Sequence, residues 1–149
     1  MPEGDAFRVT FTVPGAPRGK GAGRAAVVAG HATVFTDSKT RAEMGAVRVI
    51  ASAAMQGRAP YEGPVVLRAC AYMTIPASFS QRKRAAAEAG ELVPAKKPDA
   101  DNFLKLLGDG LNQVVWRDDA QVVTAVIHKR YSERPRLAID VRSAEQQAG

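Results

Sequence analysis

The sequence predicts an α/β (α+β) fold: a single compact domain over residues 1–149, with helices packed on a mixed β-sheet. The length and the 46% content of apolar residues suit one domain of ordinary size with a real hydrophobic core. Stretches with the period of strands are interleaved with stretches of helical period, which favours helices packed on a sheet. No internal repeat and no linker divides the chain.

The N-terminal part is expected to begin with a strand and a hairpin. Residues 7–13 alternate apolar and polar side chains, which is typical of a half-buried strand, and Pro14-Gly15 ends the run. Two short apolar runs, 25–28 and 32–35, flank Gly30-His31 and predict a hairpin.

A helix and a central strand are expected next. Thr36-Asp37-Ser38 offers capping side chains for a helix that continues to about Met55. The face expected to be buried comprises Ala42, Ala46, Val49, Ile50 and Ala53. Residues 65–73 form a nearly continuous apolar run after Pro64, which indicates a strand inside the sheet.

The second half of the chain predicts two helices and two strands. In order, these are a short basic helix over 81–89 capped by Ser78 or Ser80, a helix from Asp99 to about Val114, and strands over 121–130 and 136–141. Trp116 is expected in the core, and the polar tail over 143–149 is expected to fray.

Several classes of protein are excluded by composition. No apolar run approaches the roughly 20 residues that span a bilayer, and no secretory signal is visible, so a cytoplasmic protein is expected. The single cysteine, Cys70, forms no internal disulfide. The glycine-rich stretch 19–23 lacks a Gly-Lys-Ser/Thr ending, so no nucleotide cofactor is expected, and His31 and His128 stand apart from any hydrolase triad.

The charge is unevenly distributed along the chain. The formal net charge of +6 points to a polyanionic partner. Residues 1–98 hold 14 basic and 7 acidic side chains, whereas residues 99–119 hold five aspartates against Lys105 and Arg117. We call residues 99–119 the acidic island. A basic protein with one acidic island raises the question of what the island binds.

Asp99 and Asp101 flank the predicted start of a helix. Carboxylates are favoured there because they accept hydrogen bonds from unpaired backbone N–H groups and interact with the helix dipole, so simple capping is one interpretation. Asp118 and Asp119 begin the next strand and can point back toward the helix start. Converging carboxylates repel one another unless a cation lies among them, and an all-oxygen set suits Mg²⁺ or Mn²⁺.

Lys105 shares a helix face with Asp101 and Asp109 at i, i+4 and i+8. One interpretation is a surface ladder of ion pairs. In the other, the Lys105 ammonium lies beside a metal ion and stabilises charge on a phosphate, with Asp109 orienting it. Asn102 fits either a ligand or a cap.

A carboxylate island in a basic protein favours hydrolysis of a phosphodiester. A carboxylate-held divalent ion lowers the pKa of a water molecule and neutralises developing charge, while a basic surface attracts the nucleic-acid backbone. The residues expected to bind that backbone are Arg18, Lys20, Arg24, Lys96 and Lys97. Arg82, Lys83 and Arg84 of the short basic helix are further candidates, with a solvated surface as the plainer alternative.

Two segments resemble a known family. Residues 98–105, with Asp109, Leu111, Trp116 and residues 118–122 after them, are similar to the signature of RusA-type Holliday junction resolvases. A weaker similarity covers residues 13–20 and 35–40.

The resemblance implies a small homodimeric endodeoxyribonuclease of bacterial or phage-infected cells, which resolves four-way DNA junctions in recombination and repair by paired, symmetric nicks. It implies Mg²⁺, or Mn²⁺ in its place, as cofactor. It further implies that Asp99, Asp101 and Asp119 are the metal-binding catalytic carboxylates, that Lys105 is the essential basic residue, and that Asp118 supports metal binding.

Two other functions remain open from the sequence. A non-catalytic junction- or DNA-binding module, with aspartates that only cap, is disfavoured because negative charge facing phosphate opposes binding. A nuclease that acts on flaps, forks or RNA is the second alternative.

Overall fold

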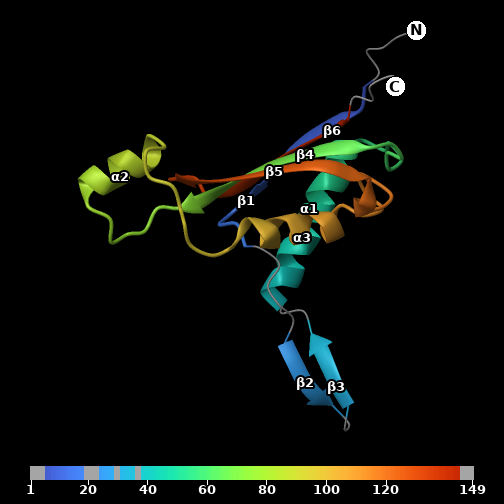
Figure 1. Cartoon of the computed structure of the whole chain (residues 1–149), viewed down its shortest axis with the longest axis horizontal. Coiled ribbons are helices and arrows are strands. Elements are labelled where there is room, and N and C mark those ends of the chain that lie inside the picture. The colour runs from blue at the N-terminus through green and yellow to red at the C-terminus, as the bar shows by residue number, and fades with distance from the viewer. Residues whose placement is uncertain (1–5, 19–23, 29–30, 36–37, 145–149) are drawn as a thin grey trace.

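A four-stranded mixed sheet forms the centre of the computed structural model, which describes residues 6–18, 24–28, 31–35 and 38–144 (Figure 1). The strands are β1 (Arg8–Pro14), β4 (Val65–Thr74), β5 (Val122–Ser132) and β6 (Arg136–Ser143). Their spatial order is β1-β6-β4-β5, with β4 parallel to β5 and the other two pairs antiparallel. The mixed sheet is confirmed, and so is the interior position of β4, which pairs on both edges.

The hairpin predicted from the two short apolar runs is also confirmed. Strands β2 (Arg24–Val28) and β3 (His31–Phe35) pair antiparallel, with Val28 opposite His31. They form a separate two-stranded sheet that stands away from the main sheet, near the start of α1 (Figure 1).

Three helices accompany the main sheet: α1 (Ser38–Met55), α2 (Gln81–Glu88) and α3 (Ala100–Gly110). Figure 1 shows α1 and α3 on the same side of the sheet, while α2 lies beyond one end of it. Among the helices that the structure describes, none combines the length and the apolar character needed to cross a bilayer. Ser80 is the cap of α2, since its hydroxyl accepts a hydrogen bond from the Lys83 amide at 3.2 Å.

The hydrophobic core lies between the sheet and the pair α1 and α3. Every second residue of β1, β4 and β6 is buried under these helices, as the alternation of strand side chains requires. Trp116 is fully buried, as predicted, and its indole N–H donates to Asn112 Oδ1 at 2.8 Å. Other fully buried side chains are Val47, Leu67, Phe103, Leu106, Leu107, Leu111, Leu137 and Val141.

The buried face of α1 differs from the prediction. The helix buries Thr40, Val47, Ala51 and Met55, whereas Val49 is 71% exposed. Ala42 and Ala53 are exposed, and Ala46 and Ile50 are half-buried. Alanines around the whole helix leave several candidate stripes of similar hydrophobicity, and contact with β1 and α3 selects the one that contains Val47.

Helix α3 ends at Gly110, earlier than the predicted Val114. Leu111 is the C-cap, and its carbonyl accepts from the amides of Val114, Val115 and Trp116 as the chain turns back. Arg48 of α1 donates to the carbonyls of Gly110 and Asn112 at 3.0 and 3.1 Å, which satisfies the end of the helix.

The strand predicted from residue 121 begins one residue later, because Asp119–Gln121 forms a 3₁₀ helix, η2. At the other end, Ser143 is the last residue of β6, and the Ala144 amide donates to the Pro64 carbonyl at 2.9 Å. The predicted frayed tail is thus part of the fold as far as Ala144. Its remainder, 145–149, lies outside the described residues, as do the expected capping residues Thr36 and Asp37.

Candidate active site

Two carboxylates of the acidic island line one hollow between α3 and the start of β5. The hollow has a volume of about 280 Å³, and Asp101, Lys105 and Asp119 supply its charged groups. Its apolar and small lining residues are Leu67, Leu104, Gly108, Val122, Val123, Thr124 and Ala125. Residues from two separate segments thereby form one site, which contains the ammonium group of one lysine and the carboxylates of two aspartates.

The local fold explains why these side chains meet. Asp101 lies in the first turn of α3, and Asp119 opens η2 after the turn that buries Trp116. A Cβ atom placed on Gly108 would lie 3.1 Å from Asp119 Oδ2. Because Gly108 has no side chain, the Asp119 carboxylate rests against the helix and faces the hollow.

Asp99 occupies the N-cap position of α3 but does not use its side chain there. Its backbone carbonyl accepts from the amides of Asn102 and Phe103 at 3.1 and 3.3 Å, while its exposed carboxylate makes no capping bond. The interpretation of Asp99 as a side-chain cap is therefore wrong.

Of the three carboxylates expected to lie together, those of Asp99, Asp101 and Asp119, only two share the hollow. Asp101 and Asp119 line the hollow, and Asp99 stands at the adjacent start of α3 without lining it. Within the part of the chain that the structure describes, no three His, Cys, Asp or Glu side chains are grouped closely enough to hold a metal ion together.

Lys105 pairs with Asp101, in agreement with their i, i+4 spacing. The Nζ atom lies 3.1 Å from Asp101 Oδ2, and both side chains are more than half exposed. An exposed pair of this kind contributes only about 0.2–0.5 kcal/mol to stability. The pair holds the ammonium at the mouth of the hollow, so its position bears more on the site than on the fold.

Asp118 makes a structural contact in addition to its predicted role. Its Oδ2 accepts from the Ala120 amide at 3.0 Å and thereby caps η2. The proposed role of Asp118 as a metal ligand stays a prediction. What the structure adds is that this carboxylate helps to fix the turn that presents Asp119.

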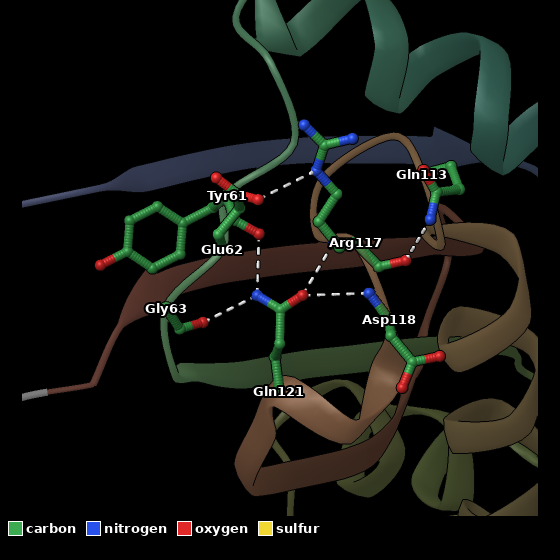
Figure 2. A network of polar contacts seen from close by, with 7 residues as sticks. All are labelled: Tyr61, Glu62, Gly63, Gln113, Arg117, Asp118 and Gln121. Atoms are coloured by element: carbon green, nitrogen blue, oxygen red, sulfur yellow. Dashed lines mark hydrogen bonds and ion pairs between the residues drawn. The ribbon is translucent and has the colours of Figure 1, made fainter.

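Gln121 holds the same turn to a distant segment (Figure 2). Its Oε1 accepts from the amides of Arg117 and Asp118 at 2.9 and 3.0 Å. Its Nε2 donates to the carbonyls of Tyr61 and Gly63, each at 2.8 Å. All the hydrogen-bonding groups of this amide are thus engaged, and the Asp118-Asp119 turn is fixed to the segment that precedes β4.

Gln121 is a positioning residue that was not among the predicted site residues. Asp118 and Gln121 form a capping box, in which each side chain bonds to the backbone of the other residue. The spacing Asp-x-x-Gln was the available signal. Its partners Tyr61 and Gly63 had no local signal, because they lie far away in the sequence.

Of the basic residues expected to bind DNA, the structure describes three side chains. Arg18, Lys96 and Lys97 are exposed, and the latter two lie in the loop just before α3. Lys20 lies outside the described residues, and Arg24 is placed in β2 by its backbone alone. The Lys96 carbonyl accepts a hydrogen bond from Lys129 Nζ, which ties this loop to β5.

Glu43 of α1 binds the backbone of the loop that follows β1 at Arg18. Its Oε1 accepts from the Arg18 amide at 2.8 Å, and its Oε2 is buried without a hydrogen-bond partner. Burial raises the pKa of Glu43 to about 7, although the hydrogen bond and the charge of Arg18 oppose the shift.

Comparison with known proteins identifies the family of the chain. The family model described as endodeoxyribonuclease RusA matches residues 14–142, a range that contains the whole acidic island. The uncharacterized protein YqaN of Bacillus subtilis (strain 168) is 34% identical over 136 residues, which is 90% of this chain and 95% of that protein. With its fold, its acidic island and most of its length covered by that family model, the chain belongs to the endodeoxyribonuclease RusA family.

Proposed function

We propose that this protein is a metal-dependent endodeoxyribonuclease that resolves four-way (Holliday) DNA junctions by paired, symmetric nicks. The observation that carries the proposal is the meeting of Asp101, Lys105 and Asp119 in one hollow of a basic protein of this family. Two carboxylates and a lysine at one site match the needs of phosphodiester hydrolysis, which requires charge neutralisation around a phosphate.

The donor chemistry of the hollow fits a hard divalent cation. Asp101 and Asp119 supply oxygen ligands, Asp99 is exposed nearby, and the bare backbone at Gly108 leaves the Asp119 carboxylate room beside the helix. These residues would hold Mg²⁺ or Mn²⁺, both of which prefer carboxylate oxygens. When bound, the ion supplies a water molecule of lowered pKa and a counter-charge for the phosphate.

Lys105 is proposed to act on the substrate phosphate. In the structure its ammonium is paired with Asp101 at the mouth of the hollow. A phosphate that enters would offer anionic oxygens to the same ammonium, whose three N–H donors can bind the phosphate in place of Asp101. Lys105 then stabilises negative charge as it increases in the transition state.

Gln121 and Asp118 are proposed to keep Asp119 in place during the reaction. Their capping box and the bonds of Gln121 to Tyr61 and Gly63 restrain the turn on both sides of Asp119. A ligand held by such a network needs less reorganisation when it binds a cation.

The basic residues expected from the sequence are proposed to bind the DNA backbone. Lys96 and Lys97 precede α3 directly and are exposed, and Arg18, Lys20 and Arg24 belong to the N-terminal basic segment. A homodimer is part of the proposal, since two symmetric nicks in a four-way junction require two sites related by a two-fold axis.

A cleavage assay on a synthetic four-way junction tests this proposal. With Mg²⁺, the wild type is expected to give paired nicks that DNA ligase reseals, whereas Asp101→Asn and Asp119→Asn abolish them. Glu133→Gln, the same change of carboxylate to amide in the turn between β5 and β6, is the matched control and should cut normally. Junction binding without product in either Mg²⁺ or Mn²⁺ would reject catalysis and favour the binding-module alternative.

The same assay decides between substrates. Linear duplex, a flap, a replication fork and a structured RNA are compared with the junction at equal concentration. If flaps, forks or RNA are cut faster than junctions, the proposed junction specificity is wrong and the protein is a nuclease for the faster substrate.

A further inference from the structure

One face of the main sheet carries no helix. The residues of β1, β4 and β6 that point to α1 and α3 form the core, so the intervening residues point to the opposite side, which neither of these helices covers (Figure 1) and which, among the described helices, only the end of α2 approaches, where Gly90 lies against Arg130. The strand register places these residues in four rows across the sheet. The rows are Arg8, Arg142, Val66 and Thr124; Thr10, Asp140, Arg68 and Val126; Thr12, Ala138, Cys70 and His128; and Pro14, Arg136, Tyr72 and Arg130. We call these sixteen positions the open face.

The open face is strongly basic. It carries five arginines (Arg8, Arg68, Arg130, Arg136 and Arg142), and Asp140 is its only acidic residue. Its formal charge is therefore +4, out of +6 for the whole chain. Solvated surfaces normally mix charges of both signs, so this excess is a feature to explain.

Several of these arginines are held in place. Asp140 Oδ2 accepts from Arg8 and from Arg142 at 2.8 and 2.9 Å, which joins two guanidinium groups across neighbouring strands. Burial alone would raise the pKa of Asp140, but the hydrogen bonds from these arginines outweigh it and lower the pKa, so the carboxylate stays ionised. Arg136 stacks on the ring of Tyr72, with 3.7 Å between its guanidinium carbon and the ring centroid.

Arg68 stands in the same row as Asp140 and is exposed. Its guanidinium has no hydrogen bond or ion pair to the residues that the structure describes, so its five N–H donors are without a partner among these residues. An ordered set of arginines with unused donors is suited to binding phosphate groups.

The open face continues from the active-site hollow. Thr124 lines that hollow and also begins the row that ends with Arg142 and Arg8. Because strands lie about 4.8 Å apart, Arg142 is about 10 Å across the sheet from Thr124. A DNA arm that leaves the hollow over β5 meets this row first.

We propose that the open face binds the phosphate backbone of a DNA arm as a second contact surface outside the Asp101 and Asp119 hollow. A second copy of the chain suits this face poorly, since it would place five arginines opposite five with only one carboxylate on each side. The identity of the anion as DNA rests on the proposed function. The chemistry that selects a polyanion rests on the arginines alone.

Binding of a fluorescent four-way junction and of a linear duplex tests the proposal, with Ca²⁺ in place of Mg²⁺ to limit cleavage. Arg68→Ala should weaken binding of both DNAs by about threefold to tenfold and reduce the slope of log K against log salt by about one. Arg68→Lys, which keeps the charge, should restore most of the affinity. Arg41→Ala, on an exposed part of α1, is the matched control, and an equal loss there would overturn the proposal.

A second pair of variants keeps every arginine. Thr12 is exposed on the edge strand β1 of the open face, so Thr12→Glu adds a carboxylate there and Thr12→Gln adds the same bulk without charge. Thr12→Glu should weaken DNA binding at least as much as Arg68→Ala, and Thr12→Gln should not. Wild-type affinity of Thr12→Glu would overturn the proposal, and so would a changed number of subunits in light scattering, because a second copy would then cover the face.

The outcome is separable from that of the proposed function. A wild type that binds DNA through Arg68 but cuts nothing in Mg²⁺ or Mn²⁺ refutes the nuclease and keeps the open face. If the wild type cuts junctions normally, but Arg68→Ala and Thr12→Glu bind DNA as tightly as the wild type, the nuclease is kept and the role of the open face is refuted.

Discussion

The carboxylate of Asp119 lies against Gly108 of α3, so closely that a methyl group at position 108 would come within 3.1 Å of Oδ2. This contact joins the second half of the acidic island to the helix that carries Asp101 and Lys105. Glycine is an unfavourable residue inside a helix, by about 1 kcal/mol relative to alanine. Gly108 lies in the last turn of α3, where its lack of a side chain leaves room for Asp119 at a cost in helix propensity.

Gly108→Ala is expected to separate stability from activity. The exposed Asp119 side chain can move by the few tenths of an ångström that the methyl group requires, so the gain in helix propensity should keep or raise the melting temperature. The displaced carboxylate should lower junction cleavage by about tenfold or more. Thermal melting and cleavage rates measure the two effects.

Gly45→Ala in α1 is the control for that change. A Cβ atom there meets no other atom within 4 Å, so the same gain in stability is expected with unchanged cleavage. Equal activity of the two alanine variants would show that Gly108 does not position Asp119.

Replacing Lys105 with glutamine should affect chemistry much more than folding. Its ion pair with Asp101 is exposed, so the free energy of unfolding should change by less than about 0.5 kcal/mol. Cleavage should fall by about 10² to 10³-fold at saturating junction, because charge on the phosphate loses its stabilisation. Arg41→Gln on α1 serves as the control, and cleavage by Lys105→Gln within threefold of the wild type would contradict the assigned role.

Gln121→Ala should weaken both the turn and the affinity for the metal ion. The variant leaves the carbonyls of Tyr61 and Gly63 without a donor, which should reduce the free energy of unfolding by about 1–3 kcal/mol. If the network positions Asp119, the Mn²⁺ concentration for half-maximal cleavage should rise as well.

Gln121→Glu distinguishes the two halves of the network. A glutamate still accepts from the amides of Arg117 and Asp118 but no longer donates to the segment before β4. An intermediate requirement for Mn²⁺ is expected. A stability loss in either variant with an unchanged Mn²⁺ requirement would limit Gln121 to a structural role.

The stability of the protein should depend on pH through Glu43. Burial raises its pKa in the folded protein to about 7 from the ordinary value of 4.5, so between these values the folded state keeps a proton that the unfolded chain has lost. The free energy of unfolding should therefore decrease as pH rises through this window. Urea unfolding at several pH values should show a flatter profile for Glu43→Gln, and parallel profiles of the two proteins would refute the prediction.

Local patterns were sufficient where the determining contacts are local. The i, i+4 spacing of Asp101 and Lys105 gave their ion pair, because helix geometry alone brings such residues together. The nearly continuous apolar run of β4 predicted a strand inside the sheet, and β4 does pair on both edges, although only one of its faces is buried under helices and Arg68 on the other face is exposed.

Contacts between distant segments could not be predicted from local sequence patterns. The end of α3 depends on Arg48 of α1, and the turn before β5 depends on the bonds of Gln121 to Tyr61 and Gly63. The buried stripe of α1 was misjudged because its alanines offer several nearly equal choices, and only the packed neighbours decide between them. Each miss reflects tertiary contacts that select among local options.

The parallel pairing of β4 with β5 has a consequence for how the site is formed in time. The two strands meet across residues 75–121, a connection that contains α2, α3 and the acidic island. Pairings between segments so far apart form slowly, because the entropy of closing the loop is lost before the ladder is gained. Asp101 and Asp119 therefore come together only once that ladder is closed, and uptake of Mn²⁺ by a refolding chain should follow the slowest folding phase.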